Sequence, residues 1–126
     1  MTIANWCVLV ACLLPVATVG LAKGAGRDAE RYNNQRPREW AARLTGWRAR
    51  ASAAQQNGFE ALPLFVAAVL LAQQAHADQD RVDALALAFV ALRLVYIAAY
   101  LANIPALRSL VWLAGVATCV ALLLMS

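Results

Sequence analysis

The sequence predicts an all-α integral membrane protein, folded as one four-helix bundle. Hydrophobic residues make up 63% of the 126 positions, and the mean hydropathy is +0.60. The charges are few, 11 Lys or Arg and 7 Asp or Glu, and 8 of the basic residues are crowded between residues 23 and 50. A short chain of this composition, with long apolar segments, is typical of a single small membrane domain.

Four apolar segments carry this prediction: roughly 3–22, 51–73, 82–102 and 107–125. Each has about the 20 residues that a helix needs to cross a bilayer. Nothing basic precedes the first segment, and its apolar run is longer than in a usual secretory signal, so we expect a retained helix. The second and third segments contain ionisable residues, and they qualify as spans only if those side chains face protein.

The loop between the first two segments, residues 23–50, is strongly basic. The second loop instead has Arg81 beside three aspartates. Because basic loops stay on the inner side of a membrane, we expect this loop in the cytoplasm and both termini outside. Topology and attraction to anionic lipid, about 1 kcal/mol per basic residue near the surface, explain the charge. A funnel for an anionic substrate is the alternative, and we expect no nucleic-acid partner.

An interfacial helix is predicted inside this loop. Pro37 suits a first helical position, and Trp40, Leu44 and Trp47 then fall on one face among arginines. This pattern favours a helix lying on the membrane surface and leading into the second span.

Two ionisable residues lie deep inside the predicted spans. Glu60 is nine residues past the start of the second segment, and Arg93 is nine residues before the end of the third. At 1.5 Å per residue both lie about 13 Å from the cytoplasmic end. An isolated charge at a helix centre costs roughly 2.5 to 3.5 kcal/mol, so we predict that Glu60 pairs with Arg93.

Further polar residues share these two faces. Asn57 is three residues before Glu60, and Tyr96 and Tyr100 follow Arg93 at helical spacing. Such a set indicates a functional site, but it is as readily explained as polar contacts that hold helices together, with the tyrosines in an interfacial aromatic belt.

The remaining chemistry-bearing residues indicate no metal site. Cys7, Cys12 and Cys119 lie in apolar segments without CxxC spacing, so we interpret them as small packing residues. His76 stands alone in the short second loop beside Asp78, where a solvated role is favoured over ligation.

These motifs resemble a known family. Asn57, Glu60 and Pro63 form N-x-x-E-x-x-P after Arg50, and the third segment reads R-L-V-Y-I-A-A-Y from Arg93 to Tyr100, followed by Arg108-Ser109. Together with four spans and a long basic first loop, this pattern is similar to the membrane-associated proteins in eicosanoid and glutathione metabolism (MAPEG).

The resemblance implies a homotrimer of four-helix bundles, with glutathione as co-substrate between neighbouring subunits near the cytoplasmic face. It implies glutathione-binding roles for Arg50, Asn57, Glu60, Arg93, Tyr96 and Tyr100. Arg108 matches the arginine that stabilises the glutathione thiolate, and is therefore the candidate catalytic residue. The short loops resemble bacterial members, which implies an inner-membrane location.

Three functions remain open at this point. The first is a glutathione transferase or peroxidase acting on hydrophobic electrophiles or lipid hydroperoxides from the bilayer. The second is a lipid-binding or scaffold protein of the same family, favoured by Ala53, which stands where the family's enzymes usually have an arginine. The third is a small multidrug transporter, disfavoured because its glutamate is expected in the first span and Glu60 lies in the second.

Overall fold

The structure is a computed structural model that describes residues 1–24 and 34–126. This part of the chain contains helices and no strand, which confirms the all-α prediction. The helices are α1 (Ile3–Gly24), α2 (Pro37–Ala42), α3 (Gly46–Gln74), α4 (Gln79–Leu101) and α5 (Pro105–Leu124). The helices α1, α3, α4 and α5 overlap the four apolar segments 3–22, 51–73, 82–102 and 107–125, with limits that differ by up to five residues, the largest difference being at the start of α3.

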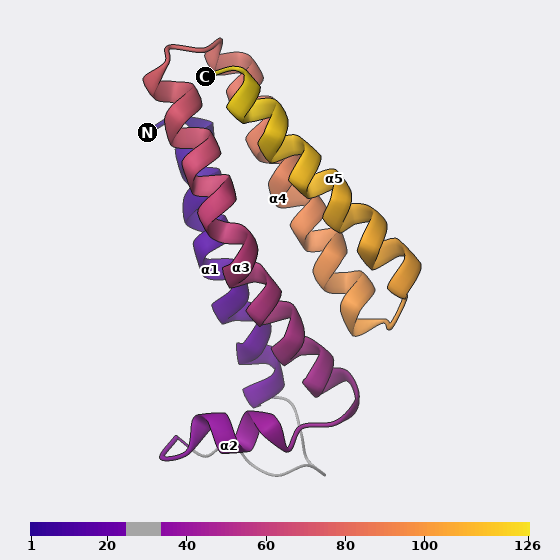
Figure 1. The fold of residues 1–126 in the computed structure, drawn as a ribbon. Coiled ribbons are helices and arrows are strands. Elements are labelled where there is room, and N and C mark those ends of the chain that lie inside the picture. Colours follow the sequence, from indigo (N-terminus) through magenta and orange to yellow (C-terminus); the bar gives the residue numbers. More distant parts are fainter. Residues whose placement is uncertain (25–33) are drawn as a thin grey trace.

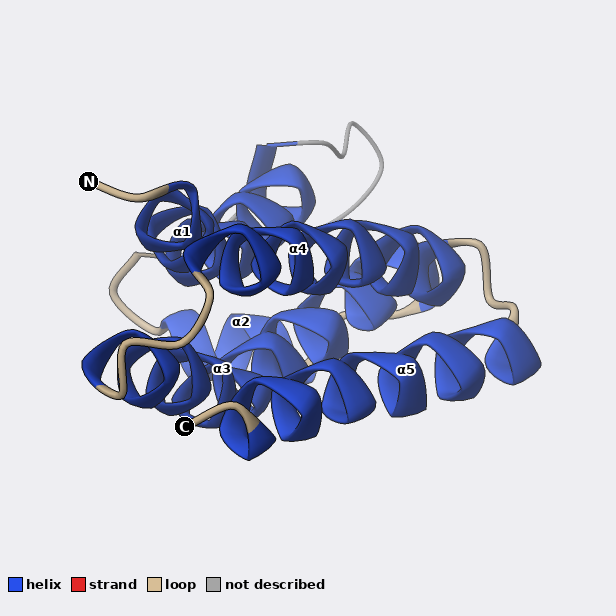
Figure 2. Cartoon of the chain, turned by 90° about the horizontal axis from the view of Figure 1, so that it is seen from above, coloured by secondary structure: helices blue, strands red, loops and turns tan. Residues whose placement is uncertain are grey.

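The four long helices alternate in direction, so both termini lie at one end and α2 lies across the other (Figure 1). The most extensive packing joins α1 to α3 and α4 to α5, and α3 also contacts both α4 and α5. Figure 2 shows the same helices from above, with short loops joining α3 to α4 and α4 to α5. The helix α2, which belongs to the basic segment, and the two termini are therefore at opposite ends of the described structure.

Three of the described helices, α1, α4 and α5, are long and apolar enough to cross a membrane. Large apolar side chains cover their outer faces: Leu9, Leu13, Val16, Leu87, Leu94, Leu110 and Leu113. Such continuous apolar faces fit lipid rather than water. Although α3 has 29 residues, it is not among the three, because its first half carries charged and amide side chains. A fourth span therefore stays a prediction.

The core consists mainly of small residues, so the helices pack closely. At its centre Phe65 of α3 stacks on Phe89 of α4, with ring centroids 4.0 Å apart and planes 10° from parallel. Cys7 and Cys119 lie in the same buried cluster. All three cysteines are free, and the described residues contain no group of His, Cys, Asp or Glu suited to a metal.

The two tight interhelical turns share one geometry. His76 after α3 and Asn103 after α4 have positive φ angles of 58° and 59°. In each turn the next residue donates its N–H to a carbonyl five residues back, Ala77 to Ala72 and Ile104 to Ala99. These are Schellman motifs, which usually end in glycine or asparagine. Asn103 fits that preference, whereas His76 adopts a left-handed backbone conformation that costs a residue with a Cβ atom about 1 to 2 kcal/mol.

The predicted interfacial helix is shorter than the sequence indicated. α2 begins at Pro37 as expected but ends at Ala42, and Trp47 belongs to the first turn of α3. Trp40 is only 1% exposed whereas Trp47 is 38% exposed, so the predicted single apolar stripe is wrong. Trp40 instead packs inward, with Leu44 beside it, because a break after α2 lets the two tryptophans face different surroundings.

Candidate functional site

Arg93 is the centre of the candidate site. It lies on α4 in the interior and is 7% exposed. One guanidinium nitrogen, Nη1, donates to Asn57 Oδ1 at 2.9 Å, whereas Nη2 is buried without a hydrogen-bond partner. A hydrogen bond from a charged donor contributes about 1.5 to 3 kcal/mol, so Asn57 and Arg93 join α3 to α4 in the apolar interior.

The predicted pair between Glu60 and Arg93 does not form within the chain. Glu60 is on the exposed side of α3, and no ion pair joins it to Arg93 in the described residues. The physical reason is helical spacing: Asn57 and Glu60 are three residues apart, close to but not on the same line along α3. Asn57 faces α4, and Glu60 turns outward although it still borders the cavity that Arg93 lines.

Two guanidinium groups and two phenol rings follow one another at the edge of the site. The Arg93 guanidinium lies 4.2 Å from the Tyr96 ring centroid, and that of Arg108 lies 4.5 Å from the Tyr100 ring. The two rings meet edge to face, with centroids 5.7 Å apart. Cation–π contacts contribute about 0.5 to 2 kcal/mol, so Tyr100 holds the side chain of Arg108 in place.

Two adjoining cavities lie between α3, α4 and α5. The first, which we call the basic cavity, has a volume of about 420 Å³ and is lined by Asn57, Tyr96, Arg108, Ser109, Trp112 and Leu113. The second, the apolar cavity, has about 220 Å³ and is lined by Asn57, Glu60, Ala61, Leu64, Phe89, Arg93, Val111, Trp112, Gly115, Val116 and Cys119. Asn57 and Trp112 border both.

The predicted site residues are thus brought together only in part. Asn57, Glu60, Arg93, Tyr96 and Arg108 line one or both cavities. Tyr100 lines neither of the two cavities and touches the site through its contact with Arg108.

Arg50 is separated from this group by its own contacts. Its Nε and Nη2 both donate to the carbonyl of Leu101, each at 3.2 Å. Leu101 is the last residue of α4, a helix with no basic residue in its last turn. The carbonyls at a helix end lack intrahelical donors and carry partial negative charge, so a cation there is favourable. In this chain the Arg50 side chain therefore caps the C-terminal end of α4.

Arg48 does the same for α1, a role that sequence reasoning missed. Its Nε and Nη2 donate to Ala22 O at 2.8 and 2.6 Å, and its guanidinium lies 5.3 Å from the Trp40 ring. The side chain is 6% exposed. The sequence indicated only its charge, because nothing in the spacing shows which carbonyl a long side chain will reach.

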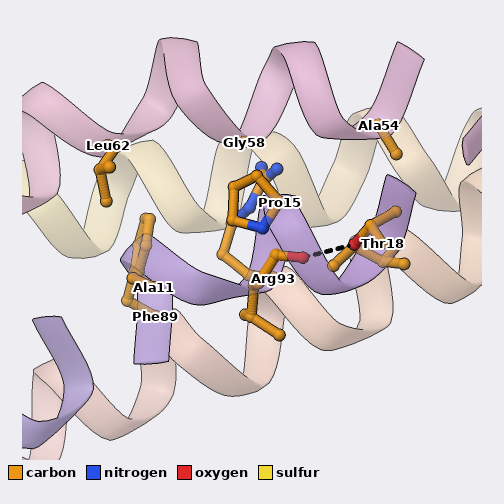
Figure 3. Close-up of a pocket in the computed structure, with 10 residues that line it drawn as sticks. Ala11, Pro15, Thr18, Ala54, Gly58, Leu62, Phe89 and Arg93 are labelled. Carbon is orange, nitrogen blue, oxygen red and sulfur yellow. Dashed lines mark hydrogen bonds between the residues drawn. The ribbon is translucent and has the colours of Figure 1, made fainter. Parts of the chain in front are cut away.

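A small cavity behind Arg93, facing α1, explains how tightly the guanidinium is enclosed (Figure 3). Pro15 of α1 approaches Gly58 of α3 there, and a Cβ on Gly58 would lie 2.8 Å from Pro15 Cγ and 3.7 Å from Arg93 Nη2. Thr18 donates to the Leu14 carbonyl at 2.7 Å beside it. Glycine at position 58 therefore permits the close approach of α1 that encloses Arg93.

Trp112 and Ser109 are the site residues that sequence reasoning overlooked or left without a role. Trp112 follows Arg108 by four residues, so both lie on one face of α5. That spacing was a usable signal. Trp112 is 44% exposed and forms the boundary between the two cavities.

The arrangement suits recognition of a polar anion beside an apolar molecule. Guanidinium groups bind carboxylates and stabilise thiolates, and Arg108 faces the basic cavity. The apolar cavity next to it is lined mostly by hydrocarbon and aromatic side chains.

The sequence model of the MAPEG family matches residues 3–126, nearly the whole chain. No curated protein and no solved structure matches it.

Proposed function

The chain belongs to the MAPEG family, and from this premise we propose that it is a membrane-embedded glutathione transferase or peroxidase. Its second substrates are hydrophobic electrophiles or lipid hydroperoxides that enter from the bilayer. Three membrane-length apolar helices support the membrane location. The observation that carries the proposal is the position of Arg108, stacked on Tyr100 and facing a cavity that Asn57 and Tyr96 also line.

The residues present fit the chemistry of glutathione, which brings two carboxylates, an ammonium and a thiol. In this proposal Arg108 is the catalytic residue, because a nearby guanidinium favours the thiolate form of the thiol. Arg93, Asn57 and Tyr96 contribute donors and an aromatic wall, and Glu60 binds the ammonium. Arg50 and Tyr100 act by holding the end of α4 and the side chain of Arg108.

The transfer step is a nucleophilic substitution or addition. The thiol proton passes to water, and the thiolate sulfur forms a bond to the electrophilic carbon while the leaving group departs with its electron pair. With a hydroperoxide, the thiolate sulfur bonds to the terminal oxygen, the O–O bond breaks, and the departing alkoxide takes a proton from water, which gives an alcohol and a glutathione sulfenic acid. The thiol of a second glutathione then bonds to the sulfenic sulfur, and the S–O bond breaks to release the hydroxyl group as water and leave the disulfide. Arg108 stabilises the negative sulfur in each case.

We also propose that three copies assemble, with glutathione between neighbouring subunits. Glu60 supports this, since it is exposed on a long helix where an isolated carboxylate facing lipid is costly. A neighbouring subunit would cover it. The basic end with α2 is assigned to the cytoplasm and both termini to the outside, in a bacterial inner membrane.

A lipid-binding or scaffold role is the second candidate. The observation that favours it is that Arg93 and Arg50 already use hydrogen-bonding nitrogens on Asn57 and Leu101 within the chain. Ala53, also on α3, stands where the family's enzymes usually have an arginine, so this position supplies no cation to bind a glutathione carboxylate.

The deciding experiment is glutathione binding to the purified protein in detergent, measured by calorimetry together with thiolate absorbance. Saturable binding with a thiolate signal that Arg108→Ala abolishes would support the enzyme. The matched control is Arg81→Ala, since Arg81 is a largely exposed arginine that pairs with Asp78 at 3.6 Å. No binding at millimolar glutathione, by protein shown to be folded and oligomeric, would favour the lipid-binding role.

A further inference from the structure

We propose that a buried water-binding site lies behind Arg93, between α1, α3 and α4, and that its water joins the Arg93 guanidinium to α1. The site is the small cavity of Figure 3, which we call the inner cavity. Arg93 and Phe89 line both this cavity and the apolar cavity on the side of α5. The inference goes beyond the proposed function and holds whether or not the protein binds glutathione.

The hydrogen-bond donor in this site is Arg93 Nη2. The side chain is 7% exposed, and its Nη1 donates to Asn57, whereas Nη2 is buried without a partner. Nη2 lies close to Gly58, another residue of the inner cavity, since a Cβ on Gly58 would be 3.7 Å away. A buried charged donor that is left unpaired is costly in an apolar interior. A partner for Nη2 is therefore expected inside this cavity.

Two acceptors line the same cavity on α1. Pro15 has no backbone N–H, so the carbonyl of Ala11, four residues earlier, loses its usual helical donor. Helical carbonyls point toward the next turn, which directs this oxygen at Pro15. Thr18 donates its hydroxyl proton to the Leu14 carbonyl at 2.7 Å, so the lone pairs of its Oγ1 are left to accept. Ala11, Pro15 and Thr18 are all buried and all line the inner cavity.

One donor facing two acceptors determines which ligand fits. A water accepts from Arg93 Nη2 and donates its two protons to the Ala11 carbonyl and to Thr18 Oγ1, which gives the three hydrogen bonds typical of a buried water. An anion has no proton to donate, so both oxygens would repel it and the guanidinium alone would attract it. The centre of a water-sized sphere has about 10 Å³ in which to move, so a water also fits by size.

The water fixes the Arg93 guanidinium from the side that Asn57 does not reach. Asn57 of α3 accepts from Nη1, and the water ties Nη2 to the backbone of α1. Hydrogen bonds from a charged donor are about twice as strong as neutral ones, so the two together set the orientation of the guanidinium. Pro15 and Thr18 thereby act as positioning residues for Arg93, because they supply a free carbonyl and a hydroxyl oxygen.

The decisive test is a crystal structure of the unmodified protein in a lipid mesophase, at a resolution that shows ordered waters. A second crystal is grown with bromide in place of chloride. We expect one water within hydrogen-bond distance of both Arg93 Nη2 and the Ala11 carbonyl oxygen, and no bromide signal at this site. A bromide peak there, a protein oxygen bonded directly to Nη2, or a cavity without ordered water would each overturn the proposal.

A second test measures stability in Thr18→Val, with Thr118→Val as its matched control. Both threonines donate to the carbonyl four residues earlier, at 2.7 and 2.9 Å, so each valine removes the same intrahelical bond and keeps the side-chain shape. Of the two, Thr18 lines the inner cavity and Thr118 does not. In mixed detergent micelles the unfolding equilibrium constant should rise about tenfold in Thr18→Val, because the water loses an acceptor. It should rise less than about threefold in Thr118→Val.

The same two variants in an Arg93→Leu background separate a link through water from simple packing. Without the guanidinium, Thr18→Val should raise the unfolding constant no more than Thr118→Val does. Equal fold-changes for Thr18→Val with and without Arg93, or equal fold-changes for the two threonines in the wild type, would contradict the proposal. The crystal structure requires no variant, so it decides the question even if Arg93→Leu fails to fold.

Discussion

Replacing Asn57 by leucine should destabilise the protein by about 2 kcal/mol, because Asn57 accepts the one hydrogen bond that Arg93 makes in the described part of the chain. Neutral side-chain pairs between membrane helices contribute only about 0.6 kcal/mol on average. The donor here is charged, 7% exposed and already has one unpartnered nitrogen, so the range for charged donors, about 1.5 to 3 kcal/mol, applies instead.

The assay is equilibrium unfolding in mixed detergent micelles, performed as a double-mutant cycle with Arg93→Leu. If the pair acts as a unit, the double variant should recover about 1.5 to 2 kcal/mol relative to the sum of the single changes. Gln56→Leu, at the exposed neighbouring position, should change stability by less than about 0.5 kcal/mol. A cost below about 0.5 kcal/mol for Asn57→Leu, or strict additivity in the cycle, would refute the reasoning.

Three further changes test other contacts. Tyr100→Leu should lower kcat/KM about fivefold to thirtyfold by releasing Arg108, while Tyr100→Phe, which keeps the ring, should retain activity; steady-state kinetics measures both. His76→Gly should raise the free energy of unfolding by about 1 kcal/mol, because glycine adopts the positive φ without strain. Gly58→Ala should destabilise by about 1 to 3 kcal/mol in the same unfolding assay, since its Cβ would lie 2.8 Å from Pro15 Cγ.

Each of these has its own control. Gly20→Ala, on a helix surface with nothing within 4 Å of the added atom, should be neutral or slightly stabilising, so equal effects at positions 20 and 58 would argue against a close approach. Asn103→Gly should gain less stability than His76→Gly, since the short polar side chain of asparagine is among the few that tolerate positive φ. Equal losses in Tyr100→Phe and Tyr100→Leu would assign the effect to the hydroxyl group rather than to the ring.

The helices were predictable from the sequence because long apolar runs report directly on membrane-length structure. The limits of 3–22, 51–73, 82–102 and 107–125 differ from the observed helices mainly where polar residues continue a helix, as in α3, which begins at Gly46. Hydropathy cannot detect such extensions. The sequence also did not reveal the break in the helix after Ala42, because the spacing of Trp40 and Trp47 is compatible with the apolar face of one continuous helix as well as with two separate helices.

The hydrogen-bonding partner of a side chain was harder to predict from the sequence than the helix face on which that side chain lies. Spacing correctly grouped Asn57 and Arg93 at one level, but depth alone could not choose between Asn57 and Glu60 as the acceptor. The attraction between opposite charges favoured Glu60 as the acceptor. The direction in which each side chain points from α3 favoured Asn57. Orientation decided the outcome: Asn57 accepts from Arg93, whereas Glu60 lies on the exposed side of α3 and only borders the cavity that Arg93 also lines.

The arginines of this chain avoid the cost of burial in two different ways, and the difference bears on function. Arg48 and Arg50 reach carbonyls at the ends of α1 and α4, where the helix itself supplies negative partial charge. Arg93 lies within α4, far from a helix end, and has one amide and one ring as partners. Because Arg48 and Arg50 are committed to backbone, their replacement should reduce stability before it reduces ligand affinity. Arg93 retains a nitrogen without a hydrogen-bond partner and lines the apolar cavity, and Arg108 lines the basic cavity. Among the described arginines that line these two cavities, both are therefore placed to act on a bound molecule.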